Sequence, residues 1–317
     1  MKTCESLSFC LHANKGLIAS QPSLFRTTDP AVPKLLIYRN SKSVIIGRNQ
    51  NPWTEAKVEN LRKHDVPLIR RWSGGGTVYH DEGNTNYSIM IPRGMFDRKA
   101  TGELVVRALR SIGLPNIRLN QRHDICLGLD KVSGSAYKLT RERAYHHGTM
   151  LINSDLTSLH ELLHPSQAGI VSKATDSVRS PVTNLRSVTP ALTHSAFAEA
   201  LAQAFLETYH NNSPDPSPHL VVRDQFEGQS VIEEGMKELQ SWEWTFGQTP
   251  EFSHMLSALG IRIHVRHGKI NAVDVPDSPS HEHRLQAALV GMRYGEFEGG
   301  LEEALVRRLM KIREDRL

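Results

Sequence analysis

The sequence predicts an α+β fold with one larger and one smaller domain. Segments with the period of a strand and segments with the period of a helix mix along the chain without the regular alternation of a βαβ protein. With 317 residues the chain is longer than one average domain and can bury a substantial core. No apolar run approaches the roughly 20 residues needed to cross a bilayer, so a soluble protein is expected.

Charge and cysteine content narrow the class of partner. The formal net charge of +4 comes from interspersed residues rather than from a Lys/Arg block, which favours phosphate or an acidic protein over nucleic acid. The 3 cysteines form no CxxC pair, which favours a reducing compartment and argues against a structural zinc. Residues 1–23 are rich in serine and poor in acids, a composition compatible with a transit peptide or with a frayed terminus.

The first regular elements follow residue 34. Residues 35–38 and 43–47 are short apolar, β-branched runs separated by four polar residues, which predicts a β-hairpin. Thr54 offers a hydroxyl to cap a helix that carries Val58 and Leu61 three positions apart. Residues 66–69 then form a strand that enters a glycine-rich loop.

The middle of the chain alternates irregularly between the two periods. Helices are expected where apolar residues recur at three and four positions, and strands where β-branched runs occur. The predicted strands are 77–79, 86–90, 124–129 and 144–153, and the predicted helices cover 104–112, ending at Gly113, and 197–205.

Two turn-rich segments divide the C-terminal third. Residues 211–218 read as a connection, and residues 241–250 mark the start of a smaller domain. Within that domain, residues 261–265 and 270–275 form a hairpin around His267 and Gly268. We therefore divide the chain into residues 1–23, 24–240 and 241–317.

The glycine-rich loop is the first functional signal. Gly74, Gly75 and Gly76 follow Arg70 and Arg71 and precede a strand. Without a Cβ, glycines let several backbone N–H groups face one anion, and the arginines add fixed positive charge. The spacing fits neither a Walker A loop nor a Rossmann fingerprint. A ligand-free hairpin or bulge is the competing interpretation.

A lysine followed by small residues is the second signal. Lys131 precedes the loop Ser133–Ala136, whose residues are too small to bury anything and leave room for a ligand. Its ammonium is a compact charge able to bridge a carboxylate and a phosphate and to stabilise adenylate formation. Asp124, seven residues earlier, would hold it in an ion pair. A solvated surface lysine is the competing interpretation.

Several histidine and cysteine patterns are weaker evidence for a metal site or a catalytic site. His160 and His164 complete an HExxH motif, but Pro165 disfavours a helical His164, and no third ligand follows at the expected spacing. His146 and His147 are adjacent on a strand and point to opposite faces, so that one would line a pocket while the other packs. Cys126 is expected in the core.

Taken together, the motifs resemble lipoate-protein ligase A and its lipoyltransferase relatives. The resemblance extends over residues 24–252, with a looser match beyond. The matching stretches, in one order along the chain, are residues 47–53, 70–88, 131–137, 145–149, 177–185 and 242–247. Before residue 24 the family usually has a strand and an acidic helix, which residues 1–23 do not match.

The resemblance implies a catalytic domain of the biotin/lipoate ligase type, a small accessory domain and a lipoyl-AMP intermediate. It also implies contacts to the nucleotide, to lipoate or to both. The residues expected to contact the nucleotide are Arg71, Gly76, Thr77, Val78 and Tyr79. Those expected to contact lipoate are Arg70, Ser73, Gly74, Gly75 and His147. Lys131 is expected to contact both, and Asp124, His80 and Asp81 to support the site. An apolar slot for the lipoyl tail is expected from Val44, Ile46, Val78 and Tyr79.

The same resemblance implies ATP and lipoate as substrates, with Mg²⁺ offsetting the triphosphate charge and no dedicated metal site in the protein. The implied acceptors are the lipoyl domains of 2-oxoacid dehydrogenase E2 subunits and glycine cleavage H protein. A monomer is implied, mitochondrial in a eukaryote and cytoplasmic in a bacterium.

Other functions remain open at this point. An amidotransferase or lipoyltransferase that uses a lipoylated donor or preformed lipoyl-AMP needs the same loop and lysine. A biotin ligase is a poorer match because its own arginine-rich loop is absent. A non-catalytic module that binds lipoyl domains and a zinc protease complete the alternatives.

Overall fold

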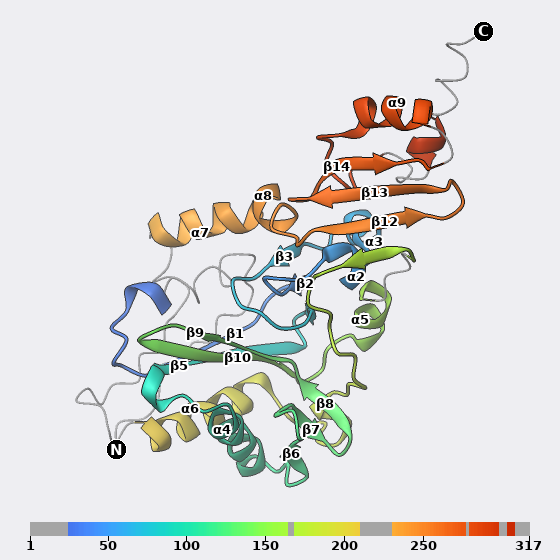
Figure 1. The fold of residues 1–317 in the computed structure, drawn as a ribbon. Coiled ribbons are helices and arrows are strands. Elements are labelled where there is room, and N and C mark those ends of the chain that lie inside the picture. Colours follow the sequence, from blue (N-terminus) through green and yellow to red (C-terminus); the bar gives the residue numbers. More distant parts are fainter. Residues whose placement is uncertain (1–24, 164–167, 210–229, 277–278, 298–302, 308–317) are drawn as a thin grey trace.

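The computed structural model places helices and strands in several layers (Figure 1). It describes residues 25–163, 168–209, 230–276, 279–297 and 303–307. The expectations for residues 1–23 and for the connection at 211–218 lie outside these ranges. Within them, no helix has both the length and the apolar character to cross a membrane.

A four-stranded antiparallel sheet forms the centre, in the order β1-β5-β10-β9. Its strands are β1 (Lys34–Tyr38), β5 (Asn84–Pro92), β10 (Arg143–Leu151) and β9 (Ser135–Leu139). Helices α4 (Arg98–Ser111) and α6 (His194–Tyr209) cover one face, below the sheet in Figure 1. Alternate residues of β5, such as Tyr87 and Ile89, pack with Leu104 and Phe197 of these helices. The other face remains for the site.

A second sheet in the order β3-β2-β4 faces the first. It contains β2 (Ser43–Ile46), β3 (Leu68–Arg70) and β4 (Val78–His80). The predicted β1–β2 hairpin is wrong, because β1 pairs with β5 whereas β2 pairs with β3 and β4. The connection does not close a tight turn. Instead the buried Asn40 donates from Nδ2 to His80 Nδ1 at 2.9 Å as the chain passes between sheets.

The helix predicted after Thr54 is two short helices, α2 (Pro52–Glu55) and α3 (Val58–Lys63). Asn51 rather than Thr54 caps α2, since Asn51 Oδ1 accepts from the Trp53 N–H at 3.0 Å. Pro52 suits the first helical position because it needs no N–H donor there. Extended backbone at Ala56 separates the two helices.

A small third sheet carries the predicted lysine and aspartate. Its strands are β6 (Ile117–Leu119), β7 (Ile125–Leu127) and β8 (Asp130–Ser133), all antiparallel. Asp124 immediately precedes β7 and Lys131 lies on β8, so the hairpin brings the two side chains together. Cys126 is buried, as expected for a core residue.

The C-terminal sheet contains one strand from the middle of the chain. The order is β11 (Ile170–Ser172), β12 (Phe252–Leu256), β13 (Ile261–Arg266) and β14 (Lys269–Asp274), and the β13–β14 hairpin confirms its prediction. Further helices are α5 (Leu156–Leu162), α7 (Ser230–Gln240), α8 (Trp242–Thr245) and α9 (Pro279–Leu289). Trp53 of α2 packs against Phe252 and Tyr294, which joins the N-terminal part of the described chain to this sheet.

Candidate active site

A cavity of about 570 Å³ lies between the first two sheets. This size suits a small-molecule ligand. Its floor is the helix-free face of the central sheet, where Tyr38, Asn86 and Thr149 are cross-strand neighbours. Its opposite wall comes from Ile45 and the glycine-rich loop. The site is therefore built from chain segments that lie far apart in sequence.

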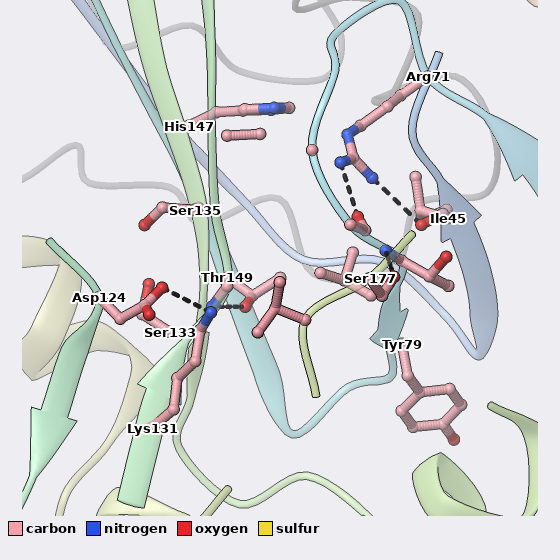
Figure 2. A pocket seen from close by; sticks show the side chains of 18 of the residues that line it. Ile45, Arg71, Tyr79, Asp124, Lys131, Ser133, Ser135, His147, Thr149 and Ser177 are labelled. Atoms are coloured by element: carbon pink, nitrogen blue, oxygen red, sulfur yellow. Dashed lines mark hydrogen bonds and ion pairs between the residues drawn. The ribbon is translucent and has the colours of Figure 1, made fainter. Parts of the chain in front are cut away.

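The predicted ion pair is present at one end of the cavity (Figure 2). Lys131 Nζ lies 2.6 Å from Asp124 Oδ1, and the two side chains are 21% and 13% exposed. Asn120 Nδ2 donates to the second oxygen of Asp124 at 3.2 Å. Ser133, close to the lysine in Figure 2, and Ser135 are small residues that also line the cavity. Partial burial and this carboxylate together orient the ammonium.

Arg71 shapes the glycine-rich loop from inside. Its Nη2 donates to the carbonyls of Gly74 and Gly76, each at 2.7 Å, and its Nη1 donates to the Ile45 carbonyl at 3.2 Å. Burial lowers the pKa of the guanidinium to about 10, so it stays charged at neutral pH. Gly75 has φ of 89°, a conformation that suits glycine. Arg71 is thus a clamp for the loop as well as a source of positive charge.

Arg70 does not line the cavity, contrary to the expectation that it shares the lipoate site. It is fully buried, and its guanidinium donates to the carbonyls of Gln50 at 2.7 Å and Thr245 at 2.9 Å. Nη2 also donates to Thr249 Oγ1 at 2.8 Å. Adjacent residues leave a strand on opposite sides, so two neighbouring arginines cannot both face one ligand.

Two of the histidines that line the cavity, His80 and His147, are in their neutral form. His80 is buried, and desolvation, with the charge of Arg71, lowers its pKa to about 3. Burial likewise puts the pKa of His147 well below its ordinary value. His147 Nε2 lies 2.8 Å from Ser73 Oγ, which in turn accepts from Arg71 Nε at 3.0 Å. His146, on the opposite face of β10, contacts Ser135 rather than lining the cavity, which confirms the predicted division between the two adjacent histidines.

The other predicted residues divide into lining and supporting positions. Ser73, Gly75, Gly76, Thr77, Val78 and Tyr79 all line the cavity. Gly74 and Asp81 are outside the lining: Asp81 instead accepts from the N–H groups of Gly83 at 2.9 Å and Asp155 at 2.7 Å. It therefore shapes the turn between β4 and β5.

The expected apolar slot is wrong for Val44 and Ile46, although Val78 and Tyr79 line the cavity as expected. Val44 and Ile46 pack into a cluster with Leu61 and Val66, away from the cavity, while Ile45 lines it. A strand buried on both faces gives no alternation from which to choose the side. The HExxH segment gives little to the site: His160 lines the cavity, α5 ends at Leu162, and His164 lies outside the described residues.

Sequence reasoning missed Glu55 and Ser177. Both line the cavity, and Ser177 N donates to Glu55 Oε1 at 3.0 Å across 122 positions of sequence. Ser177 stood inside a matching stretch, but no local pattern links it to α2.

Comparisons with known proteins agree on one family. Residues 17–206 match the model of the lipoyl protein ligase A/B catalytic domain. A Psychrobacter cryohalolentis lipoate-protein ligase A is 36% identical, covering 75% of this chain and 70% of that protein. A Schizosaccharomyces pombe protein, named provisionally as a lipoate-protein ligase A, is 43% identical over 75% of this chain and 71% of its own length.

Solved structures share the fold. A lipoate-protein ligase A bound with ATP superposes with a TM-score of 0.60 at 26% identity, covering 75% of this chain and 96% of that one. A bipartite lipoate protein ligase from Thermoplasma acidophilum, studied with its E2 lipoyl domain, gives 0.60 and 26%, covering 74% and 93%. P. falciparum LipL1 in complex with lipoate gives 0.65 at 22% identity, covering 95% and 92%, and supports the fold alone.

Proposed function

This chain belongs to the lipoyl protein ligase A/B catalytic-domain family, and we propose that it joins lipoate to a protein lysine through a lipoyl-AMP intermediate made from ATP. It is a lipoate-protein ligase or lipoyltransferase enzyme. The finer assignment rests on one observation. Lys131, held by Asp124, lies at the end of a cavity that the glycine-rich loop also lines.

In the first step, a lipoate carboxylate oxygen attacks the α-phosphorus of ATP, and the bond from that phosphorus to the β-phosphate bridging oxygen breaks. Lipoyl-AMP forms and pyrophosphate leaves. Two anions must approach each other, so the ammonium of Lys131 would lower their repulsion and stabilise the charge that gathers on the phosphate. Asp124 would orient Lys131 but make no contact with the reacting atoms.

In the second step, the neutral amine of an acceptor lysine attacks the lipoyl carbonyl carbon. The carbon–oxygen bond to the phosphate breaks, AMP leaves, and the amine loses a proton as the amide forms. The proposed acceptors are lipoyl domains of 2-oxoacid dehydrogenase E2 subunits and glycine cleavage H protein. An archaeal relative studied with its E2 lipoyl domain supports that class of partner.

Substrate assignments draw on the same comparisons. ATP binding is supported by the relative solved with ATP, and the uncharged floor and apolar Ile45 and Val78 suit a lipoyl tail. Mg²⁺ is proposed as the companion of ATP, since it offsets the triphosphate charge and needs few protein ligands.

The test is lipoate-dependent exchange of labelled pyrophosphate into ATP. Exchange by the purified chain, together with lipoylation of an acceptor domain, is the expected result. Lipoyl transfer from preformed lipoyl-AMP or from a lipoylated donor, without any exchange, would overturn the ATP step and assign a lipoyltransferase instead.

A further inference from the structure

One irregular segment crosses the cavity between the C-terminal sheet and Lys131. We call residues 173–182 the strap. Six consecutive residues of it, 175–180, line the cavity. Its first part is fixed by the Thr175 N–H, which donates to the Asn49 carbonyl at 2.9 Å, and its end by the Lys131 N–H, which donates to the Pro181 carbonyl at 2.8 Å. Its middle is fixed by Ser177.

Glu55 holds Ser177 with both carboxylate oxygens. Oε1 accepts from the Ser177 N–H at 3.0 Å, and Oε2 accepts from the Ser177 hydroxyl. Oε2 also lies 2.9 Å from Thr77 Oγ1, a donor on the glycine-rich loop. Glu55 is only 6% exposed, so these hydrogen bonds replace those that the carboxylate would make to water in the unfolded chain. One carboxylate therefore contacts both walls of the cavity.

The hydroxyl of Ser177 is fully used. It has one proton, which it donates to Glu55, and two acceptor positions. Those accept from the Thr77 N–H at 2.8 Å and from Gln50 Nε2 at 2.9 Å. Gly76 permits this approach, because a Cβ there would lie 3.0 Å from Ser177 Oγ.

A carboxylate is the group that this arrangement requires. Ser177 presents two donors, its N–H and its O–H, to two oxygens of Glu55. The side-chain amide of glutamine has one oxygen that accepts and one NH₂ group that donates. With glutamine at position 55, the NH₂ group would therefore face one of the two Ser177 donors, and that hydrogen bond would be lost. If the Ser177 hydroxyl turned away, it would lose its bond from Thr77 or Gln50.

We propose that Glu55 is a positioning residue that sets the separation between the strap and the Gly76–Thr77 wall, and thereby the fit of the nucleotide. The inference rests on the proposed function, in which this wall contacts the nucleotide. Glu55 acts through Ser177 and Thr77. Its effect falls on nucleotide affinity rather than on lipoate affinity, because Gly76 and Thr77 belong to the expected nucleotide set, whereas the lipoyl tail is proposed to lie between the sheet floor and Ile45 and Val78.

The experiment compares Glu55→Gln, Ser177→Ala and the double variant, with Glu59→Gln as the control because Glu59 is an exposed glutamate on the adjacent helix α3. The readouts are the Kd for ATP by direct binding, the KM values for ATP and lipoate in pyrophosphate exchange, and the thermal midpoint. Each single variant should weaken ATP binding on the order of tenfold, and the double variant should be no weaker than the worse single one. The KM for lipoate should not change.

An ATP affinity within about twofold of wild type in folded Glu55→Gln, or additive losses in the double variant, would overturn the proposal. If Glu55→Gln does not fold, Ser177→Ala with unchanged ATP affinity overturns it equally. Wild-type protein that binds ATP without exchanging pyrophosphate contradicts the ligase function instead, because the affinity comparison remains measurable.

Discussion

Nζ of Lys131 lies 2.6 Å from Oδ1 of Asp124, so the lysine charge is fixed in direction before any ligand is present. Asp124 immediately precedes β7 and Lys131 lies on β8, the next strand of the same hairpin, where Lys131 pairs with Cys126. In the proposed reaction, a charge that is already oriented needs no rearrangement as charge develops on the phosphate.

Lys131→Ala should strongly slow adenylate formation while the fold remains. Loss of the ammonium removes stabilisation of the phosphate charge, and a fall of about 10² to 10³ in pyrophosphate exchange is expected. Exchange rate and thermal midpoint are to be measured beside Lys63→Ala, an exposed lysine on α3. A Lys131→Ala protein that makes lipoyl-AMP at the wild-type rate contradicts the assignment.

Substitution by lysine should have different effects at Arg70 and at Arg71. Arg70→Lys leaves several carbonyls short of donors, and its unfolding free energy in urea should fall by about 2 kcal/mol. Its ATP affinity should stay near wild type. Arg71→Lys cannot reproduce the fork to Gly74 and Gly76, so both stability and ATP affinity should decrease. Equal ATP affinities in the two variants would contradict this difference.

Two glycines of the loop provide a matched pair. Gly75 has φ of 89°, and a Cβ there would lie 3.0 Å from Arg71 Nη2 and 3.1 Å from Ala136 Cβ. Gly75→Ala should therefore cost about 1 kcal/mol or more of stability and weaken ATP binding. Gly74→Ala meets nothing within 4 Å and should behave as wild type in urea unfolding and ATP titration. The reverse order of effects would exclude the loop geometry described here.

Acid should destabilise the protein through its buried histidines. Burial lowers the pKa of His146 to about 3, and burial with Arg71 does the same for His80, whereas both are near 6.5 in an unfolded chain. Below about pH 6.5 the unfolded state therefore binds more protons than the folded state, and stability falls until the pH nears the folded values. Each such histidine contributes a slope of up to about 1.4 kcal/mol per pH unit.

His146→Phe removes one of the buried histidines that take up a proton on unfolding in acid. Urea unfolding between about pH 6 and about pH 4.5 should show a shallower loss of stability than in wild type, whatever the absolute stability of the variant. His64→Phe, which changes an exposed histidine, should keep the wild-type slope. Identical slopes in all three proteins would show that His146 does not stay neutral in the fold.

Most helices and strands were predictable from local patterns, because period and end signals suffice for them. Helix α4 ends beside Gly113, and the β13–β14 hairpin turns at His267 and Gly268. Pairing between strands was not predictable in the same way. The supposed hairpin partner of β1 belongs to another sheet, because long-range partners rather than the short connection decide pairing.

The site was predictable where one segment carries several of its residues. The Lys131–Asp124 pair followed from a short spacing, and the glycine-rich loop from composition and family resemblance. The predictions for Arg70, Val44 and Ile46 are wrong because tertiary packing decides which side of a doubly buried strand faces the ligand. Glu55 and Ser177 could not be paired from local patterns at all.

The strap has a consequence for how this sequence can vary in length. The strap begins directly after β11, which pairs with β12 in the C-terminal sheet, and ends at the β-bridge between Val182 and Lys131. Both ends of the strap are hydrogen-bonded and Ser177 is fixed between them. An inserted or deleted residue would therefore break at least one of these hydrogen bonds. Insertions between Ser172 and Val182 should therefore be far less tolerated than in an ordinary surface loop.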